Sequence, residues 1–240
     1  MTSTTPPVRL VFCDVDETLI DCKSMFDFLD YYLGERHGQD GLARAREVRE
    51  SLLAQAARGV PREETNRSYF RAFTGESARE VEQWGERWFA ERSARASFYL
   101  APTRAALARH RAAGAALVLV SGSFPALLGP IARDVGAHHV IATLPQERDG
   151  MLTGSIVGEP VIGRGKHAAV LSVLARHPHL DAADCYGYGD HISDLPMLEA
   201  VGHPVVVGHN PELLARLPGA QQLPTAAEEL DEVREVAGAQ

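Results

Sequence analysis

The sequence predicts an α/β protein: a doubly wound parallel sheet with an all-helical segment inserted after the first strand. Residues 8–13 form an apolar, β-prone run without polar alternation, which is typical of a buried parallel strand. From about residue 98 onward, apolar runs alternate with helical patterns, as in a sheet whose strands are connected by helices. The segment between them shows helical patterns only. These observations predict a Rossmann-like core of residues 1–21 and 99–240 and a helical cap of residues 22–98.

Apolar spacing and Gly, Pro and capping signals define the individual elements. Cap helices are expected at 24–33, 41–57, 62–73 and 77–92, separated by glycine-containing breaks. Core helices are expected at 102–113, 126–135, 166–176, 195–200 and 211–217, and further strands at 115–120, 139–143, 151–157, 183–188 and 205–207. Residues 227–240 are expected to form a frayed tail or a terminal helix.

Composition argues against several functions. The 240 residues carry 24 Lys and Arg against 32 Asp and Glu, a formal net charge of −8, which leaves no basic footprint for nucleic acid or an anionic membrane. No apolar stretch is long enough to span a bilayer, and the N-terminus lacks the pattern of a signal peptide. Three cysteines without metal-ligand spacing favour a reducing compartment. We therefore expect a cytoplasmic protein without nucleic-acid or membrane partners; the sequence leaves its oligomeric state open.

Polar side chains gather where the expected strands end. Because the carboxyl ends of parallel strands meet at one edge of a sheet, these side chains are expected to share one crevice. Four neighbouring carboxylates would repel one another without a cation, and their oxygens suit Mg²⁺. The candidate residues are Asp14, Asp16, Thr18, Ser121, Lys166, Asp190 and Asp194.

The same residues suit phosphate chemistry. Magnesium is commonly completed by a substrate phosphate, and a lysine and a serine hydroxyl are suitable phosphate ligands. A carboxylate nucleophile can form an aspartyl-phosphate, and a second carboxylate can act as general acid and then as general base. The pattern therefore predicts hydrolysis of a small-molecule phosphate ester.

Four motifs carry a resemblance to a known family. DVDETL at 14–19, Ser121-Gly122-Ser123, Lys166 and GDHISDLPML at 189–198 follow one another in order. This series resembles the haloacid dehalogenase (HAD) superfamily of hydrolases, subclass IB, the phosphoserine-phosphatase-like branch with a helical cap. The acid at residue 16 resembles phosphatase members rather than dehalogenases.

The resemblance implies roles for the residues after the first strand. Asp14 would be the nucleophile and a Mg²⁺ ligand, and Asp16 the general acid and base, with its backbone carbonyl also on the metal. Asp190 would be the remaining protein ligand of the Mg²⁺ ion. Thr18 would orient Asp16, and Glu17 would point away from the site.

Further roles concern the phosphoryl group. Ser121 would donate to its oxygens, and the backbone N–H groups of Gly122 and Ser123 would lie near them. Lys166 would neutralise charge on the phospho-enzyme, and Asp194 would support Lys166 and the metal-bound water.

The sequence signals for the identity of the substrate are weaker than those for the reaction. Lys23 stands where phosphoserine phosphatases carry a glutamate that binds the substrate amino group, so a cation there disfavours phosphoserine. Arg67 and Arg71 roughly match the place of a carboxylate-binding arginine in that branch. His191 would lie at the edge of the site without an assigned role.

Three alternatives remain open at this point. A phosphotransferase or mutase of the same superfamily would use the same residues. A receiver-type signalling module also combines acidic residues, Ser or Thr and Lys on a doubly wound sheet, but it is about half as long and lacks both the cap and the acid at residue 16. A non-catalytic binding protein on this fold would not need every catalytic position filled.

Overall fold

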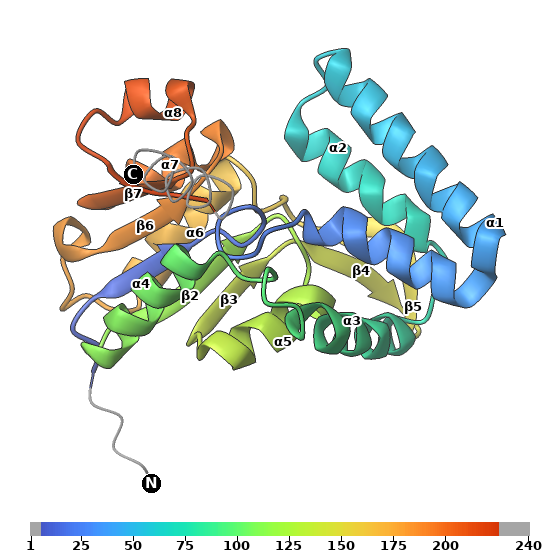
Figure 1. Cartoon of the computed structure of the whole chain (residues 1–240), viewed down its shortest axis with the longest axis horizontal. Coiled ribbons are helices and arrows are strands. Elements are labelled where there is room, and N and C mark those ends of the chain that lie inside the picture. The colour runs from blue at the N-terminus through green and yellow to red at the C-terminus, as the bar shows by residue number, and fades with distance from the viewer. Residues whose placement is uncertain (1–5, 226–240) are drawn as a thin grey trace, which may run out of the picture.

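The structure, a computed structural model, describes residues 6–225 and contains one six-stranded parallel sheet (Figure 1). The strand order is β3-β2-β1-β6-β7-β8, so β1 lies in the interior of the sheet, between β2 and β6. The strands are β1 (Leu10–Cys13), β2 (Ala116–Ser121), β3 (His139–Ala142), β6 (Tyr186–Gly189), β7 (His203–Val207) and β8 (Gln221–Leu223). This architecture confirms the predicted fold class. Within the described part of the chain, no helix has the length and apolar character needed to cross a membrane.

Side-chain alternation along β1 divides the core between the two faces of the sheet. Val11 and Cys13 belong to a cluster that includes residues of α4 (Ala101–Ala112) and α5 (Pro125–Val135). Leu10 and Phe12 belong to a second cluster, with residues of α6 (Arg164–Leu174), α7 (Leu195–Leu198) and α8 (Pro211–Arg216). Because both faces are covered, β1 has no solvent-facing side, which explains its unbroken apolar sequence.

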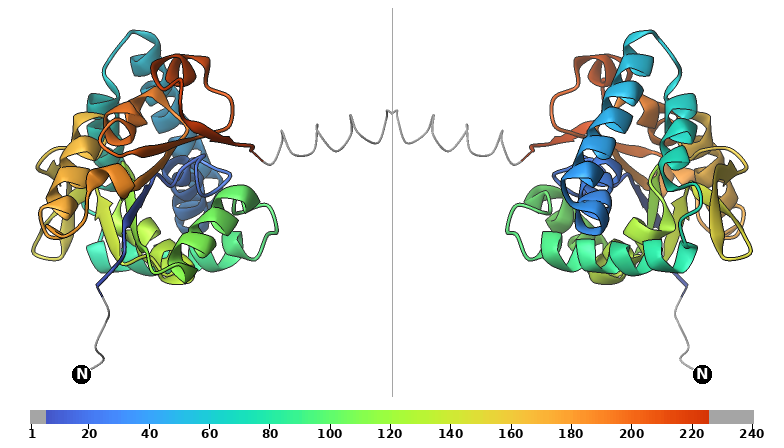
Figure 2. Two further views of the ribbon diagram at one scale, coloured as in Figure 1. Left: turned by 90° about the vertical axis from the view of Figure 1, so that its left-hand side faces the viewer. Right: turned by 90° about the vertical axis from the view of Figure 1, so that its right-hand side faces the viewer.

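A helical segment follows β1 and stands beside the carboxyl end of the sheet (Figures 1 and 2). It consists of α1 (Ser24–Ala57), α2 (Arg62–Tyr69), the 3₁₀ helix η1 (Phe70–Phe73) and α3 (Ala78–Ser93). The antiparallel hairpin β4 (Leu144–Arg148) and β5 (Met151–Val157) lies next to it and bonds to the turn before α3, where Gly75 donates to the Leu152 carbonyl at 2.8 Å. Smaller 3₁₀ turns are η2 (Ala182–Asp184) and η3 (Ile192–Asp194).

The expected break at 34–38 is confirmed, because the residues of α1 form two helices that meet at Gly38, whose φ of 58° and ψ of −134° favour glycine. Other expected boundaries were wrong. Residues 70–73 tighten into η1 instead of extending the preceding helix. The short edge strand β8 was missed because Gln221 and Gln222 are exposed and form no apolar run. The expected tail or helix at 227–240 lies outside the described residues.

The division into core and cap stays a prediction, and its proposed boundary passes through packed elements. Whereas α1 and α2 stand away from the sheet, α3 lies along α5, and Glu86 on α3 bonds Arg133 on α5 at 2.5 Å (Figure 1). The helical segment and the core therefore share part of one apolar cluster.

Trp88 on α3 anchors this shared cluster, and its truncation has a predictable effect on stability. The side chain is fully buried, its ring lies edge-on to Phe28 and Phe98, and its Nε1 donates to Asp27 at 2.5 Å. We expect Trp88→Ala to lower the free energy of unfolding by about 3–5 kcal/mol, because it leaves a large cavity. Urea denaturation measures the free energy of unfolding. Trp84→Ala is the control, and its effect should be smaller because Trp84 is only half-buried. Equal losses in the two variants would contradict the central role of Trp88.

Candidate active site

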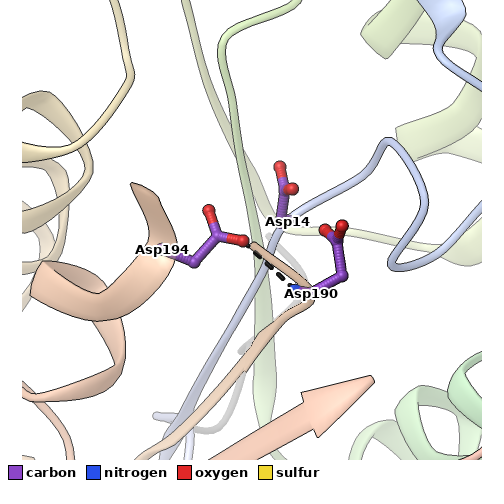
Figure 3. Close-up of side chains that lie close together, drawn as sticks. All are labelled: Asp14, Asp190 and Asp194. Carbon is purple, nitrogen blue, oxygen red and sulfur yellow. Dashed lines mark hydrogen bonds between the residues drawn. The ribbon is translucent and has the colours of Figure 1, made fainter. Parts of the chain in front are cut away.

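The predicted carboxylates meet at one edge of the sheet. Asp14 follows β1, Asp190 follows β6, and Asp194 ends η3. Figure 3 shows the three side chains gathered around one space, and an oxygen of each lies within 4.8 Å of those of the other two. The carboxyl ends of adjacent parallel strands thus form the expected crevice.

Lys166 is the cation of this cluster. It lies in the first turn of α6, is 3% exposed, and its Nζ is 2.6 Å from an oxygen of Asp14 and 2.6 Å from an oxygen of Asp194. Burial lowers the pKa of Lys166, but the two carboxylates outweigh burial and raise that pKa, so the lysine stays charged. Burial also raises the pKa of Asp14, against the attraction of Lys166. One lysine therefore compensates only part of the buried negative charge.

Asp194 positions other groups. Its Oδ1 accepts from Lys166 at 2.6 Å, and its Oδ2 accepts the backbone N–H of His191 at 3.1 Å. The same Oδ2 accepts the backbone N–H of Asp190 at 3.2 Å, the bond drawn in Figure 3. The side chain is 1% exposed. Both of its oxygens are thus engaged, and they fix the lysine and the loop that carries Asp190.

Asp16 has the environment of an acid that can exchange protons. Its Oδ1 is buried and has no hydrogen-bond partner among the described residues. Burial raises the pKa of the carboxyl to about 6, although hydrogen bonds from Ser24 oppose this shift. A carboxyl with a pKa near 6 can both give and take a proton around neutral pH.

Thr18 contacts a different carboxylate from the one that the resemblance implied. Its hydroxyl donates to Asp190 Oδ1 at 2.8 Å rather than orienting Asp16. The reason is topological: β1 pairs with β6, so the loop after β1 lies beside the residue that follows β6. Burial and Asp194 raise the pKa of Asp190 to about 6, and the hydrogen bond from Thr18 opposes them.

The last residue of β2, next to the loop that follows it, carries a buried hydroxyl. Ser121 is 2% exposed, and its Oγ accepts the backbone N–H of Ser123 at 3.1 Å. That N–H therefore orients Ser121, whereas the family resemblance implied that it lies near the phosphate. Gly122 lines the pocket, and a Cβ there would lie 2.9 Å from Ile162, so only glycine fits without displacing that side chain. Asn66 on α2 donates to the Gly122 carbonyl at 2.9 Å and so connects the helical segment to this loop.

The acidic residues fit a divalent cation. Burial and the neighbouring carboxylates raise the pKa values of Asp14 and Asp190, which means that their ionised forms are disfavoured. A bound cation would stabilise these ionised forms. Asp194 belongs to the geometric cluster, but Lys166 and two backbone N–H groups occupy its oxygens. Asp14 and Asp190 thus remain as the side-chain ligands, and carboxylate oxygens suit a hard cation such as Mg²⁺.

A pocket of about 310 Å³ adjoins these groups, and α2 faces it with one stripe of side chains. The stripe consists of Arg62, Thr65, Asn66 and Tyr69, at helical spacing. The sequence pointed instead to Arg67 and Arg71, which are not among the lining residues. Arg67 bonds Glu159 at 2.5 Å and the carbonyl of Gly158 at 3.1 Å. Arg62 and Asn66 were missed because a helix that is polar on every side does not reveal which face meets the site.

Lys23 lines the pocket, but as half of an ion pair. Its Nζ is 3.3 Å from Glu17, which also lines the pocket and adopts a φ of 59°. The expectation that Glu17 points away was wrong, and the pair presents little net charge to a ligand. His191 lies in the lining, where its Nδ1 accepts the Ser193 N–H at 3.0 Å and so helps to shape the loop.

Comparisons with known proteins agree with this geometry. Residues 11–199 match the family model of haloacid dehalogenase-like hydrolases. A probable phosphatase of Mycobacterium tuberculosis is 42% identical over 106 residues, which cover 44% of this chain and only 36% of that protein. The phosphoserine phosphatase SerB1 of the same organism is 32% identical over 221 residues, or 88% of this chain and 68% of the relative.

Solved structures show the same fold. A protein of unknown function from Bordetella pertussis Tohama I is 31% identical and superposes with a TM-score of 0.78, covering 91% of this chain and 99% of that one. A substrate-bound phosphoserine phosphatase is 18% identical with a TM-score of 0.67, covering 97% and 99% of the two chains, and this likeness concerns the fold alone. The family match, the long alignment with SerB1 and the shared fold lead to one conclusion: the chain belongs to the haloacid dehalogenase-like hydrolase family, in its phosphoserine-phosphatase-like branch.

Proposed function

We propose that this protein is a Mg²⁺-dependent phosphatase that hydrolyses a small-molecule phosphomonoester through an aspartyl-phosphate on Asp14. The observation that carries the proposal is the buried Lys166, 2.6 Å from both Asp14 and Asp194, at a pocket that also contains Asp16 and Asp190. This arrangement combines a nucleophile, a proton donor and a phosphate-binding cation within one small cavity.

In the first half-reaction, an oxygen of Asp14 attacks phosphorus and the ester P–O bond breaks. Because Lys166 holds Oδ1 of Asp14, the other carboxylate oxygen is the one free to attack. Asp16 gives its proton to the departing alkoxide oxygen, which leaves as an alcohol. Lys166 and the hydroxyl of Ser121 stabilise the negative oxygens of the phosphoryl group during transfer.

In the second half-reaction, the ionised Asp16 takes a proton from water. The resulting hydroxide attacks phosphorus of the aspartyl-phosphate, the acyl-phosphate bond breaks, and Asp14 returns as a carboxylate with release of inorganic phosphate. Asp14, Asp190 and the backbone carbonyl of Asp16 would hold Mg²⁺, which when bound neutralises phosphate charge and lowers the repulsion between nucleophile and substrate.

The proposed substrate is not phosphoserine, although SerB1 carries that name. Apart from Asp14, Asp16 and Asp190, Glu17 is the single carboxylate of the described pocket lining. The Lys23 Nζ already lies 3.3 Å from it. A substrate ammonium would thus have to displace a lysine to find a partner. The free carboxylate that a zwitterionic amino acid requires is missing from this lining.

The proposal also places the protein in the cytoplasm, which suits its thiols. Cys13, Cys22 and Cys185 are free cysteines. Burial raises the pKa of Cys22 to about 12 and that of Cys13 well above its ordinary value, so both remain protonated and poorly reactive. Free, unreactive thiols are compatible with a reducing compartment.

Phosphate release from a broad panel of phosphomonoesters, with Mg²⁺ present, tests the function. We expect turnover of at least one ester, loss of that turnover after treatment with EDTA, and recovery when Mg²⁺ is restored in excess. Undiminished turnover in EDTA would overturn the metal-dependent mechanism. Turnover of phosphoserine as fast as that of the best ester would overturn the argument from Glu17 and Lys23.

A further inference from the structure

The part of the pocket wall contributed by α1 is apolar. Met25 and Phe26 line it from the first turn of the helix, and Leu52, Leu53 and Ala56 line it from the last turns. Ala56 lies four positions after Leu52 and three after Leu53, so it shares one side of the helix with both. Leu53 is 55% exposed, whereas Leu52 is 6% exposed. The α1 side of the pocket therefore offers an apolar surface in the same pocket as Asp14, Asp16 and Asp190.

Most polar groups of the same wall form hydrogen bonds or ion pairs within the protein. Glu17 neutralises Lys23, and the Tyr69 hydroxyl donates to the Met25 carbonyl at 2.7 Å. Arg62 donates to Ser193 at 3.2 Å and keeps its positive charge, because no carboxylate of the described residues pairs with it. Asn66 Oδ1 is buried without a partner among the described residues, but its amide group lies against Gly122, at the phosphate end. Away from that end, the wall presents no unpaired carboxylate to a charged ligand.

We infer that the substrate is a phosphomonoester of a predominantly apolar alcohol without a cationic group, with an alkyl or aryl body that packs on Leu52, Leu53 and Ala56. This inference rests on the proposed phosphatase function and names its substrate class. The phosphate lies at Lys166 and Ser121, and the organic body extends from there along α1. Each methylene that the wall removes from water should strengthen binding by about fourfold.

Binding of alkylphosphonates tests the inference separately from catalysis, because their P–C bond is not an ester bond. Calorimetry in the presence of Mg²⁺ compares methyl-, butyl-, hexyl- and octylphosphonate, which carry the same charge. We expect affinity to rise with chain length until the wall is covered. Leu53→Ser should weaken octylphosphonate binding by about fivefold to tenfold and leave methylphosphonate binding unchanged, since only the longer chain reaches residue 53.

Leu171→Ser is the matched control. Leu171 is also a leucine on a helix, is 51% exposed and does not line the pocket, so its replacement should change neither affinity. Affinity that is independent of chain length, or a chain-length effect that survives Leu53→Ser unchanged, would overturn the inference. A rising affinity without phosphate release from any ester would support the apolar pocket while overturning the proposed phosphatase function, so the two failures are distinguishable.

Discussion

Asp14→Asn is expected to abolish phosphate release, with a loss of about a thousandfold or more, because an amide cannot form the aspartyl-phosphate. The variant should nevertheless fold. Burial raises the pKa of Asp14 in the folded state, so the carboxyl is stabilising while protonated and that contribution is lost as the pH rises through its folded-state pKa. Burial disfavours the ionised form of this carboxyl, a cost that a neutral side chain avoids. Replacing the carboxyl with a neutral isostere should leave the metal-free protein at least as stable as the wild type.

Two measurements check this expectation: phosphate release with Mg²⁺, and urea denaturation in EDTA. Asp134→Asn serves as control, because Asp134 pairs with Arg104 at 3.0 Å and does not line the pocket. The control should retain full activity. An active Asp14→Asn variant would refute nucleophilic catalysis by this residue, and an unfolded one would refute the argument from its buried charge.

Lys166→Met is expected to affect both activity and stability. The substitution removes the cation that lies 2.6 Å from both Asp14 and Asp194 and leaves these buried carboxylates uncompensated. Breaking a buried ion pair from one side costs about 3–5 kcal/mol. Loss of the phosphate-binding charge should also lower kcat by about a hundredfold or more.

The chain's other lysine provides the comparison. Lys23 is exposed and pairs with Glu17 at 3.3 Å, so Lys23→Met should change the free energy of unfolding by less than about 1 kcal/mol. Chemical denaturation of both variants in EDTA gives the stability difference, and phosphate release gives the catalytic one. Similar destabilisation by the two substitutions would show that Lys166 is not the structural centre of the site.

Local patterns were sufficient for most of the fold. The run before Asp14 predicts β1 because a strand covered on both faces excludes polar residues, and the two apolar clusters account for both faces. Boundaries were less predictable where packing decides. The break at Gly38 was predictable because its φ of 58° favours glycine, whereas the 3₁₀ geometry of residues 70–73 was not.

The placement of single side chains in the site depended on contacts between distant segments. Thr18 meets Asp190, 172 positions away, because β1 and β6 are adjacent strands. Arg62 rather than Arg67 lines the pocket because the rotation of α2 is set by its packing, for example by the Asn66 contact with Gly122. The spacing of Arg62, Asn66 and Tyr69 is a helical stripe that sequence reasoning can recognise only after one of its members has been placed.

The proposed chemistry could be read from local sequence patterns. Asp14, Asp16, Lys166 and Asp190 each follow a strand or begin a helix, and parallel topology brings such positions to one edge whatever the details of packing. The surroundings of the rest of a substrate depend on tertiary packing. The pairing of Lys23 with Glu17 and the exposed apolar face of Leu53 arise from how α1 and α2 lie against the core, and no local pattern encodes that arrangement.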